Sequence, residues 1–234
     1  MSIKISAVIF VAALGFSGCA ANLLQSARPV EKGKTEFFIA PAVSYNGLVK
    51  ERGLVVDNAA LQLGMRLGVK DNVDIGVRSF LGLGALLEGK YNFMPQESPW
   101  ALSLRAGFGG GSYGYGERLW HAPLGVLASY DHGALTPYGG VTYGAYWIYG
   151  REPNSIDPDL TYAPRKGHGD GLLHLTGGLK WMFASWVGLV IDYTGLVPVV
   201  NDPGDFYRFK TTHQAALGLV FVAGPTAGKK SSPE

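Results

Sequence analysis

Residues 100–109 read WALSLRAGFG, in which large apolar side chains alternate with small or charged ones. In an extended strand, Trp100, Leu102 and Leu104 share one face, and Ser103 and Arg105 share the other. The same pattern recurs about ten times along the sequence, with aromatic residues on the apolar face and charged residues opposite. An apolar outer face and a polar inner face predict an all-β protein, a closed antiparallel transmembrane β-barrel.

The composition agrees with a barrel. The chain has 234 residues, among them 34 glycines and 12 tyrosines, and 16% of its residues are charged. After residue 20 the sequence has no apolar run long enough for a membrane helix, so we expect only strands to cross a bilayer. The basic residues are spread over the sequence, which argues against a nucleic-acid partner.

The alternation predicts about ten strands, with eight as the alternative count. The expected ranges are 34–46, 58–69, 73–81, 84–94, 99–110, 121–131, 137–149, 171–183, 187–197 and 209–222. Short turns and longer loops mostly alternate between them, which is typical of an outer-membrane barrel with both termini in the periplasm. Pro41 lies inside the first range, and its missing amide predicts a bulge or a later strand start.

Charged residues of both signs fall on the inner face. They are Glu36, Arg66, Asp74, Arg78, Glu88, Lys90, Arg105, Lys180, Asp192 and Lys210. The interior of a small barrel is narrow, so we expect these side chains to pair into a network that closes the lumen. Because more of them are basic than acidic, the alternative is a narrow, weakly anion-selective channel.

The first residues predict export. Lys4 precedes an apolar run over residues 5–16, which is too short to cross a bilayer as a helix. We therefore expect a signal peptide over residues 1–18, a periplasmic linker over 19–33, the barrel over 34–222 and a polar tail over 223–234.

Cys19 is the only cysteine in the sequence, so an intramolecular disulfide is excluded. The stretch Phe16-Ser17-Gly18-Cys19-Ala20 resembles the lipobox of bacterial lipoproteins, although Phe16 replaces the usual leucine. This resemblance implies that Cys19 carries a lipid. The alternative is ordinary cleavage after Ala20, which would remove Cys19.

Aromatic residues gather where the expected strands end, as they do at the two edges of a bilayer. Next to the short turns lie Tyr91, Phe93, Trp100, Tyr130, Tyr138, Trp181 and Trp186, and near the long loops lie Tyr45, Trp120, Trp147 and Tyr149. The sequence thus predicts two aromatic girdles.

The sequence makes no case for a cofactor or a metal. Residues 110–114 spell G-x-S-x-G, but no helical pattern follows to build a nucleophile elbow. His174 is expected to face the lumen, whereas His121 and His132 are expected at strand ends. His168 shares a long loop region with Asp157, Asp159 and Asp170, and acid–histidine pairs at the rim resemble those of outer-membrane proteases. We interpret this region as a solvated loop.

Taken as a pattern, the chain is similar to small outer-membrane β-barrel proteins of Gram-negative bacteria. Its last strand, with outward Leu217, Leu219 and Phe221, resembles the signal read by the barrel-insertion machinery, although a tail follows it. The resemblance implies outer-membrane lipids as surroundings. Because the charged network is expected to close the lumen and no catalytic motif is found, we expect a structural or surface-interaction role rather than an enzyme. The narrow channel, a hydrolase with an active site in the extracellular loops, and a lipocalin-like carrier are the alternatives.

Overall fold

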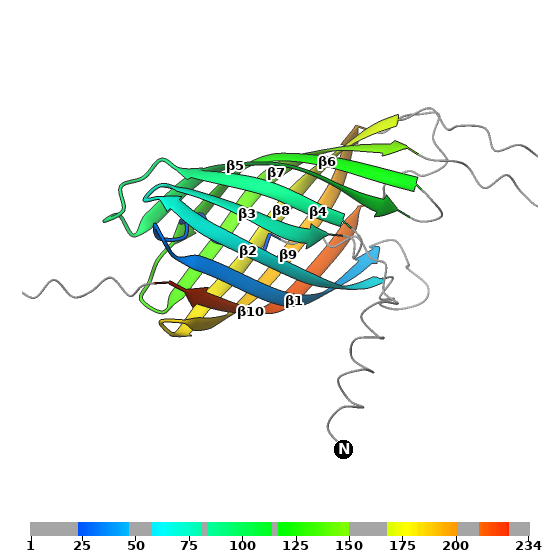
Figure 1. The fold of residues 1–234 in the computed structure, drawn as a ribbon. Coiled ribbons are helices and arrows are strands. Elements are labelled where there is room, and N and C mark those ends of the chain that lie inside the picture. Colours follow the sequence, from blue (N-terminus) through cyan, green and yellow to red (C-terminus); the bar gives the residue numbers. More distant parts are fainter. Residues whose placement is uncertain are drawn as a thin grey trace, which may run out of the picture.

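The computed structural model describes residues 23–46, 58–80, 84–113, 117–149, 168–200 and 211–224. They contain the strands β1 (Thr35–Asn46), β2 (Asn58–Lys70), β3 (Val73–Phe80), β4 (Gly84–Asn92), β5 (Trp100–Tyr113), β6 (Glu117–Tyr130), β7 (Leu135–Tyr149), β8 (His168–Ala184), β9 (Val187–Val200) and β10 (Thr212–Ala223). Each strand pairs antiparallel with its chain neighbours, and β1 pairs with β10, so the sheet closes (Figure 1). The predicted closed ten-stranded barrel is confirmed. In the described ranges, no helix is long and apolar enough to cross a membrane.

The two ends of the barrel differ. The turns between β2 and β3, β4 and β5, β6 and β7, and β8 and β9 all lie at one end, on the left in Figure 1. We call this the short-turn end. The first residue of β1, Thr35, pairs there with the last residue of β10, Ala223. The residues that connect the strands at the opposite end, 47–57, 81–83, 114–116, 150–167 and 201–210, lie outside the described ranges.

Side chains alternate between an apolar outer face and a mostly buried inner face. On β5, Leu102 and Leu104 are exposed, whereas Ser103 and Arg105 are buried. Every one of the ten strands carries at least one exposed large apolar side chain. A protein in water would bury these groups, so the outer face suits a lipid environment.

Aromatic side chains surround the barrel near the short-turn end. Trp100 packs on Tyr130 with ring centroids 4.7 Å apart, and Trp181 packs on Phe183 at 5.7 Å. At the other end, Trp120 stacks on Phe108 at 5.4 Å. The placement of Tyr138 in the girdle is wrong, because its side chain is 6% exposed and faces the lumen. The side chains of Tyr45 and Tyr149 lie outside the description.

Two predictions about strand boundaries are corrected. β5 continues to Tyr113 and β6 begins at Glu117, whereas the predicted ranges end at residue 110 and begin at residue 121. Glycine there leaves room for Trp120, whose ring would lie 2.7 Å from a Cβ on Gly110. Pro41 causes no bulge, because β1 pairs in one unbroken register with β2, including Pro41 opposite Leu61.

Residues 23–30 lie inside the barrel, and we call them the inner segment. The sequence analysis places residues 19–33 in a linker outside the barrel, and the structure differs for this part of them. Leu23, Leu24 and Ala27 are buried in one apolar cluster with inward-facing residues of the wall. The wall members of this cluster are Phe38, Ala40, Ala42, Ala60, Ala101, Leu127, Tyr138, Val190, Ala216 and Val220. The inner segment therefore packs against an apolar part of the lumen wall, which the sequence did not predict.

The chain leaves the lumen over Gly68. The Gly33 N–H donates to the Gly68 carbonyl oxygen at 2.9 Å, and Gly33 has a φ of 77°, which favours glycine. A Cβ on Gly68 would lie 2.1 Å from the Glu31 carbonyl oxygen. A side chain at residue 68 would therefore push the inner segment away from the wall.

Candidate functional site in the lumen

The candidate site consists of the charged side chains of the lumen wall together with the inner segment. Glu36, Arg66, Asp74, Arg78, Glu88, Lys90, Arg105 and Asp192 are buried, and Lys180 is nearly so. Lys210 and Cys19 lie outside the described residues, so their predicted roles stay predictions. All nine described members of the predicted inner-face set therefore face the lumen.

Glu88 on β4 is the centre of one cluster. Arg105 on β5 contacts its Oε2 through Nε at 2.8 Å and Nη2 at 2.6 Å, and Arg78 on β3 lies 3.7 Å from the same oxygen. The other carboxylate oxygen, Oε1, accepts a hydrogen bond from Gln25 Nε2 at 3.2 Å. Glu88 thus joins three neighbouring strands and also holds the inner segment.

Asp74 on β3 and Lys90 on β4 are register partners and form a second cluster. Asp74 pairs with Arg66 and lies 3.5 Å from Lys90 Nζ. The Val30 N–H donates to Asp74 Oδ2 at 2.9 Å. Lys90 Nζ donates to the carbonyl oxygens of Ser26 at 2.6 Å and of Arg28 at 2.9 Å. The buried charges therefore satisfy main-chain groups that would otherwise lose their hydrogen bonds to water.

Asp192 on β9 holds the far end of the inner segment. Its carboxylate accepts the N–H groups of Leu23 at 3.3 Å and Leu24 at 3.0 Å, and the hydroxyl of Tyr138 at 2.8 Å. Leu24 has a φ of 51°, in the left-handed region that costs a non-glycine residue about 1 kcal/mol. Two consecutive N–H groups on one carboxylate are the contacts that offset this strain.

Glu36 on β1 and Lys180 on β8 form a separate ion pair. Their strands are not neighbours, because β10 and β9 lie between them in the sheet. The pair therefore spans the inner surface of two intervening strands. Most of the predicted network is thus brought together, but in two clusters, one pair and one acceptor for the inner segment.

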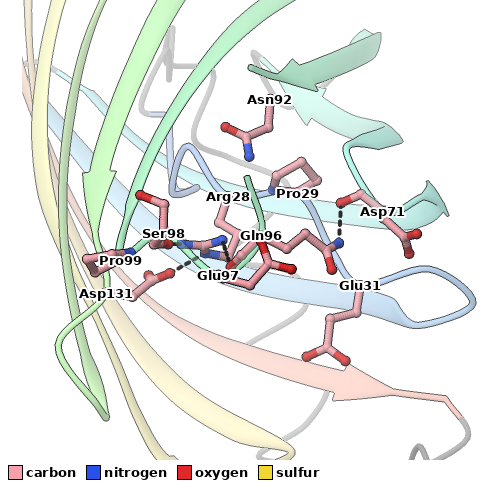
Figure 2. A pocket seen from close by; sticks show the side chains of 10 residues that line it. All are labelled: Arg28, Pro29, Glu31, Asp71, Asn92, Gln96, Glu97, Ser98, Pro99 and Asp131. Atoms are coloured by element: carbon pink, nitrogen blue, oxygen red, sulfur yellow. Dashed lines mark hydrogen bonds and ion pairs between the residues drawn. The ribbon is translucent and has the colours of Figure 1, made fainter. Parts of the chain in front are cut away.

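Arg28 ties the inner segment to the short-turn end. Its guanidinium pairs with Asp131 after β6 and donates to the carbonyl oxygens of Gln96 at 3.1 Å and Ser98 at 2.5 Å (Figure 2). These groups line a cavity of about 410 Å³ at the mouth of the lumen, whose lining also includes Glu31, Asp71 and Glu97. The lining of this cavity therefore carries four carboxylates, those of Glu31, Asp71, Glu97 and Asp131, and one cation, Arg28.

A second group of aromatic and imidazole rings lies deeper in the lumen. The rings of His121 and Tyr146 stack with centroids 4.2 Å apart, and the Tyr146 hydroxyl shares a 3.1 Å hydrogen bond with His174 Nε2. A Cβ on Gly144 would lie 2.8 Å from His174 Nε2 and 2.9 Å from His121 Nε2. The prediction for His174 is confirmed, whereas His121 lies within β6 and not at a strand end.

Four residues of the site were not predicted as such from the sequence: Gln25, Arg28, Ser103 and Tyr138. Ser103 could have been predicted, because it lies with Arg105 on the inner face of the expected strand 99–110. Nothing in the pattern of residues 23–30 predicts burial inside a barrel. Among the described side chains, no group of three or more His, Cys, Asp or Glu residues is arranged to hold a metal ion. His168 and Asp170 lie in β8 and not in a loop as predicted. Their side chains lie outside the description, so the hypothesis of a catalytic rim stays a prediction.

Comparisons with known proteins match the architecture alone. The sequence matches no protein-family model and no curated protein. Ail, the attachment invasion locus protein of Yersinia pestis, is 11% identical with a TM-score of 0.36, covering 82% of this chain and 99% of that one. The outer membrane protease OmpT of Escherichia coli is 12% identical with a TM-score of 0.48, covering 81% and 96%. The translocator domain of the autotransporter NalP of Neisseria meningitidis is 12% identical with a TM-score of 0.38, covering 94% and 95%.

Proposed function

We propose that this protein is an outer-membrane β-barrel with a structural or surface-interaction role, whose lumen is closed by the inner segment and the charged network. The apolar outer face and its aromatic rims support insertion among outer-membrane lipids. Delivery there would use the barrel-insertion machinery, with the short-turn end and both termini on the periplasmic side.

One observation carries the proposed closure. Asp192, Glu88 and Asp74 lie on β9, β4 and β3, and each accepts a hydrogen bond from the inner segment. The segment therefore crosses the lumen between opposite parts of the wall. Leu23 and Leu24 add apolar contact to these bonds. A chain held in this way excludes hydrated ions from the narrow interior of a ten-stranded barrel.

A narrow channel is the second candidate. Of the described network members, Arg66, Arg78, Lys90, Arg105 and Lys180 are basic and Glu36, Asp74, Glu88 and Asp192 are acidic. A lumen with this excess would select anions weakly if the inner segment were displaced. The two candidates therefore differ in whether the resting protein conducts.

Planar-bilayer recordings on the purified full chain test the closure. We expect little steady conductance from the wild type, and a higher conductance from Glu88→Gln, because Arg105 then loses its carboxylate partner. Leu87→Ala is the matched control, since Leu87 is the outward-facing neighbour on the same strand. A large and stable wild-type conductance would overturn the proposed closure and favour the channel.

A further inference from the structure

The lumen wall recognises the main chain of the inner segment. Asp192 accepts the N–H groups of Leu23 and Leu24. Ser103 Oγ donates to the Ala27 carbonyl oxygen at 2.5 Å. Lys90 donates to the carbonyl oxygens of Ser26 and Arg28, and Asp74 accepts the Val30 N–H. From Leu23 to Val30, side chains of the wall thus accept hydrogen bonds from main-chain N–H groups and donate hydrogen bonds to main-chain carbonyl oxygens.

Main-chain recognition does not depend on the side chains of the bound peptide. Peptide-binding proteins use the same division, in which backbone hydrogen bonds supply affinity and side-chain pockets supply selectivity. Here the selective part is the apolar cluster, which takes Leu23, Leu24 and the small Ala27. The lumen therefore suits a peptide with two adjacent large apolar residues and a small residue three positions after them, as Ala27 follows Leu24.

The inner segment has the properties of an occupant that can leave. Within the described residues, its covalent connection to the wall runs through residues 31–34 into β1. Leu24 holds a left-handed backbone while bound, which is relieved on release. Arg28, which ties the segment at the mouth, is partly exposed, and so is its partner Asp131.

We propose that the short-turn half of the lumen is a peptide-binding site, which the inner segment occupies in cis and which a peptide of the same kind from another chain takes in its place. This inference rests on the proposed closure by the inner segment. The segment is then an intramolecular competitor, and the barrel binds a peptide from outside only when the competitor is weakened. The acidic residues at the mouth favour a peptide that carries a basic residue about four positions after its apolar pair, as Arg28 follows Leu24.

The probe is a fluorescein-labelled synthetic peptide with the sequence of residues 21–32, ANLLQSARPVEK. The receptor is the full chain, folded in detergent micelles, as wild type and as the double variant Leu23→Glu/Leu24→Glu. The two glutamates place negative charge in the apolar cluster beside Asp192 and should expel the inner segment. Fluorescence anisotropy should show saturable binding to the double variant and at least about tenfold weaker binding to the wild type, because of its tethered competitor.

Two matched controls address the recognition itself. A peptide with glutamate in place of both leucines should bind the double variant at least about tenfold more weakly. Adding Asp192→Asn to the double variant should weaken binding of the unchanged peptide to a similar extent, because two main-chain contacts of the peptide lose the carboxylate charge. Heat-modifiable mobility on gels checks that each variant is folded. If the double variant does not fold, Arg28→Ala, which loosens the segment at the mouth, replaces it.

Conductance recorded on the same samples separates this inference from the proposed function. A folded variant that conducts but binds no peptide overturns the peptide site and leaves the closure intact. A folded variant that neither conducts nor binds overturns both. Equal binding of the leucine and glutamate peptides also overturns the site. Saturable binding that lowers the variant's conductance supports both.

Discussion

Two neighbouring residues on β5 test the assignment of inner and outer faces with the same new side chain. Leu104→Lys places an ammonium group on the outer face, where Leu104 is 40% exposed. The cost of such a charge at the bilayer midplane is about 2–4 kcal/mol and falls toward the interface. Leu104 is the fifth residue of β5 from the short-turn end, so we expect about 2 kcal/mol. Arg105→Lys keeps a cation beside Glu88 and loses the hydrogen bond from Arg105 Nε, for about 1 kcal/mol.

Unfolding by denaturant from phospholipid vesicles measures both changes. A loss of about 2 kcal/mol lowers the ratio of folded to unfolded protein roughly 30-fold, against about fivefold for 1 kcal/mol. The fraction folded, read from heat-modifiable mobility on gels, gives the same order independently. If Arg105→Lys destabilises the barrel as much as Leu104→Lys, or more, the assignment of the lumen face is wrong.

Further predictions concern the inner segment and the N-terminus. Gly68→Val should raise conductance at unchanged barrel stability, because its side chain would collide with the Glu31 carbonyl; a silent variant contradicts the close approach. Lys180→Met should destabilise the barrel by about 3 kcal/mol in denaturant unfolding, since Glu36 is left buried without its partner, whereas Lys180→Arg should be nearly neutral. Cys19→Ala should abolish metabolic fatty-acid labelling and accumulate precursor; normal processing to the same N-terminus would rule out lipidation.

The barrel could be predicted from the sequence because the environment repeats with the period of a strand. Each residue on β5 faces either the outer surface or the lumen. The apolar Leu104 and the charged Arg105 can therefore be assigned to a face from the type of side chain. Side chains that suit both environments do not allow this assignment. The glycines around Gly110 have no side chain that alternates, so the sequence does not show that β5 and β6 continue there. An aromatic residue such as Tyr138 is suited both to the membrane interface and to a hydrogen bond in the lumen.

The inner segment could not be predicted, for a different reason. It is not a strand of the barrel, so its apolar and polar residues do not alternate with the period of a strand. Its contact partners are also far away in the sequence. The contact between Leu23 and Asp192 joins residues 169 positions apart. The charged residues of the lumen were identified individually, but only the closed sheet shows that Lys90 and Asp74 hold a peptide backbone as well as each other.

The two hypotheses about the N-terminus constrain each other through the position of Leu23. Cys19 is four residues before Leu23, and four residues span at most about 14 Å. Leu23 lies in the lumen on Asp192, and the wall is a closed sheet without an edge through which acyl chains could pass. A lipid on Cys19 can therefore reach the bilayer only around a rim of the barrel. Planar-bilayer recordings on the acylated protein and on Cys19→Ala test whether lipidation and closure coexist. Equally low conductance shows that the inner segment stays on Asp192 with the lipid attached, and a higher conductance of the acylated protein shows that lipidation displaces the segment.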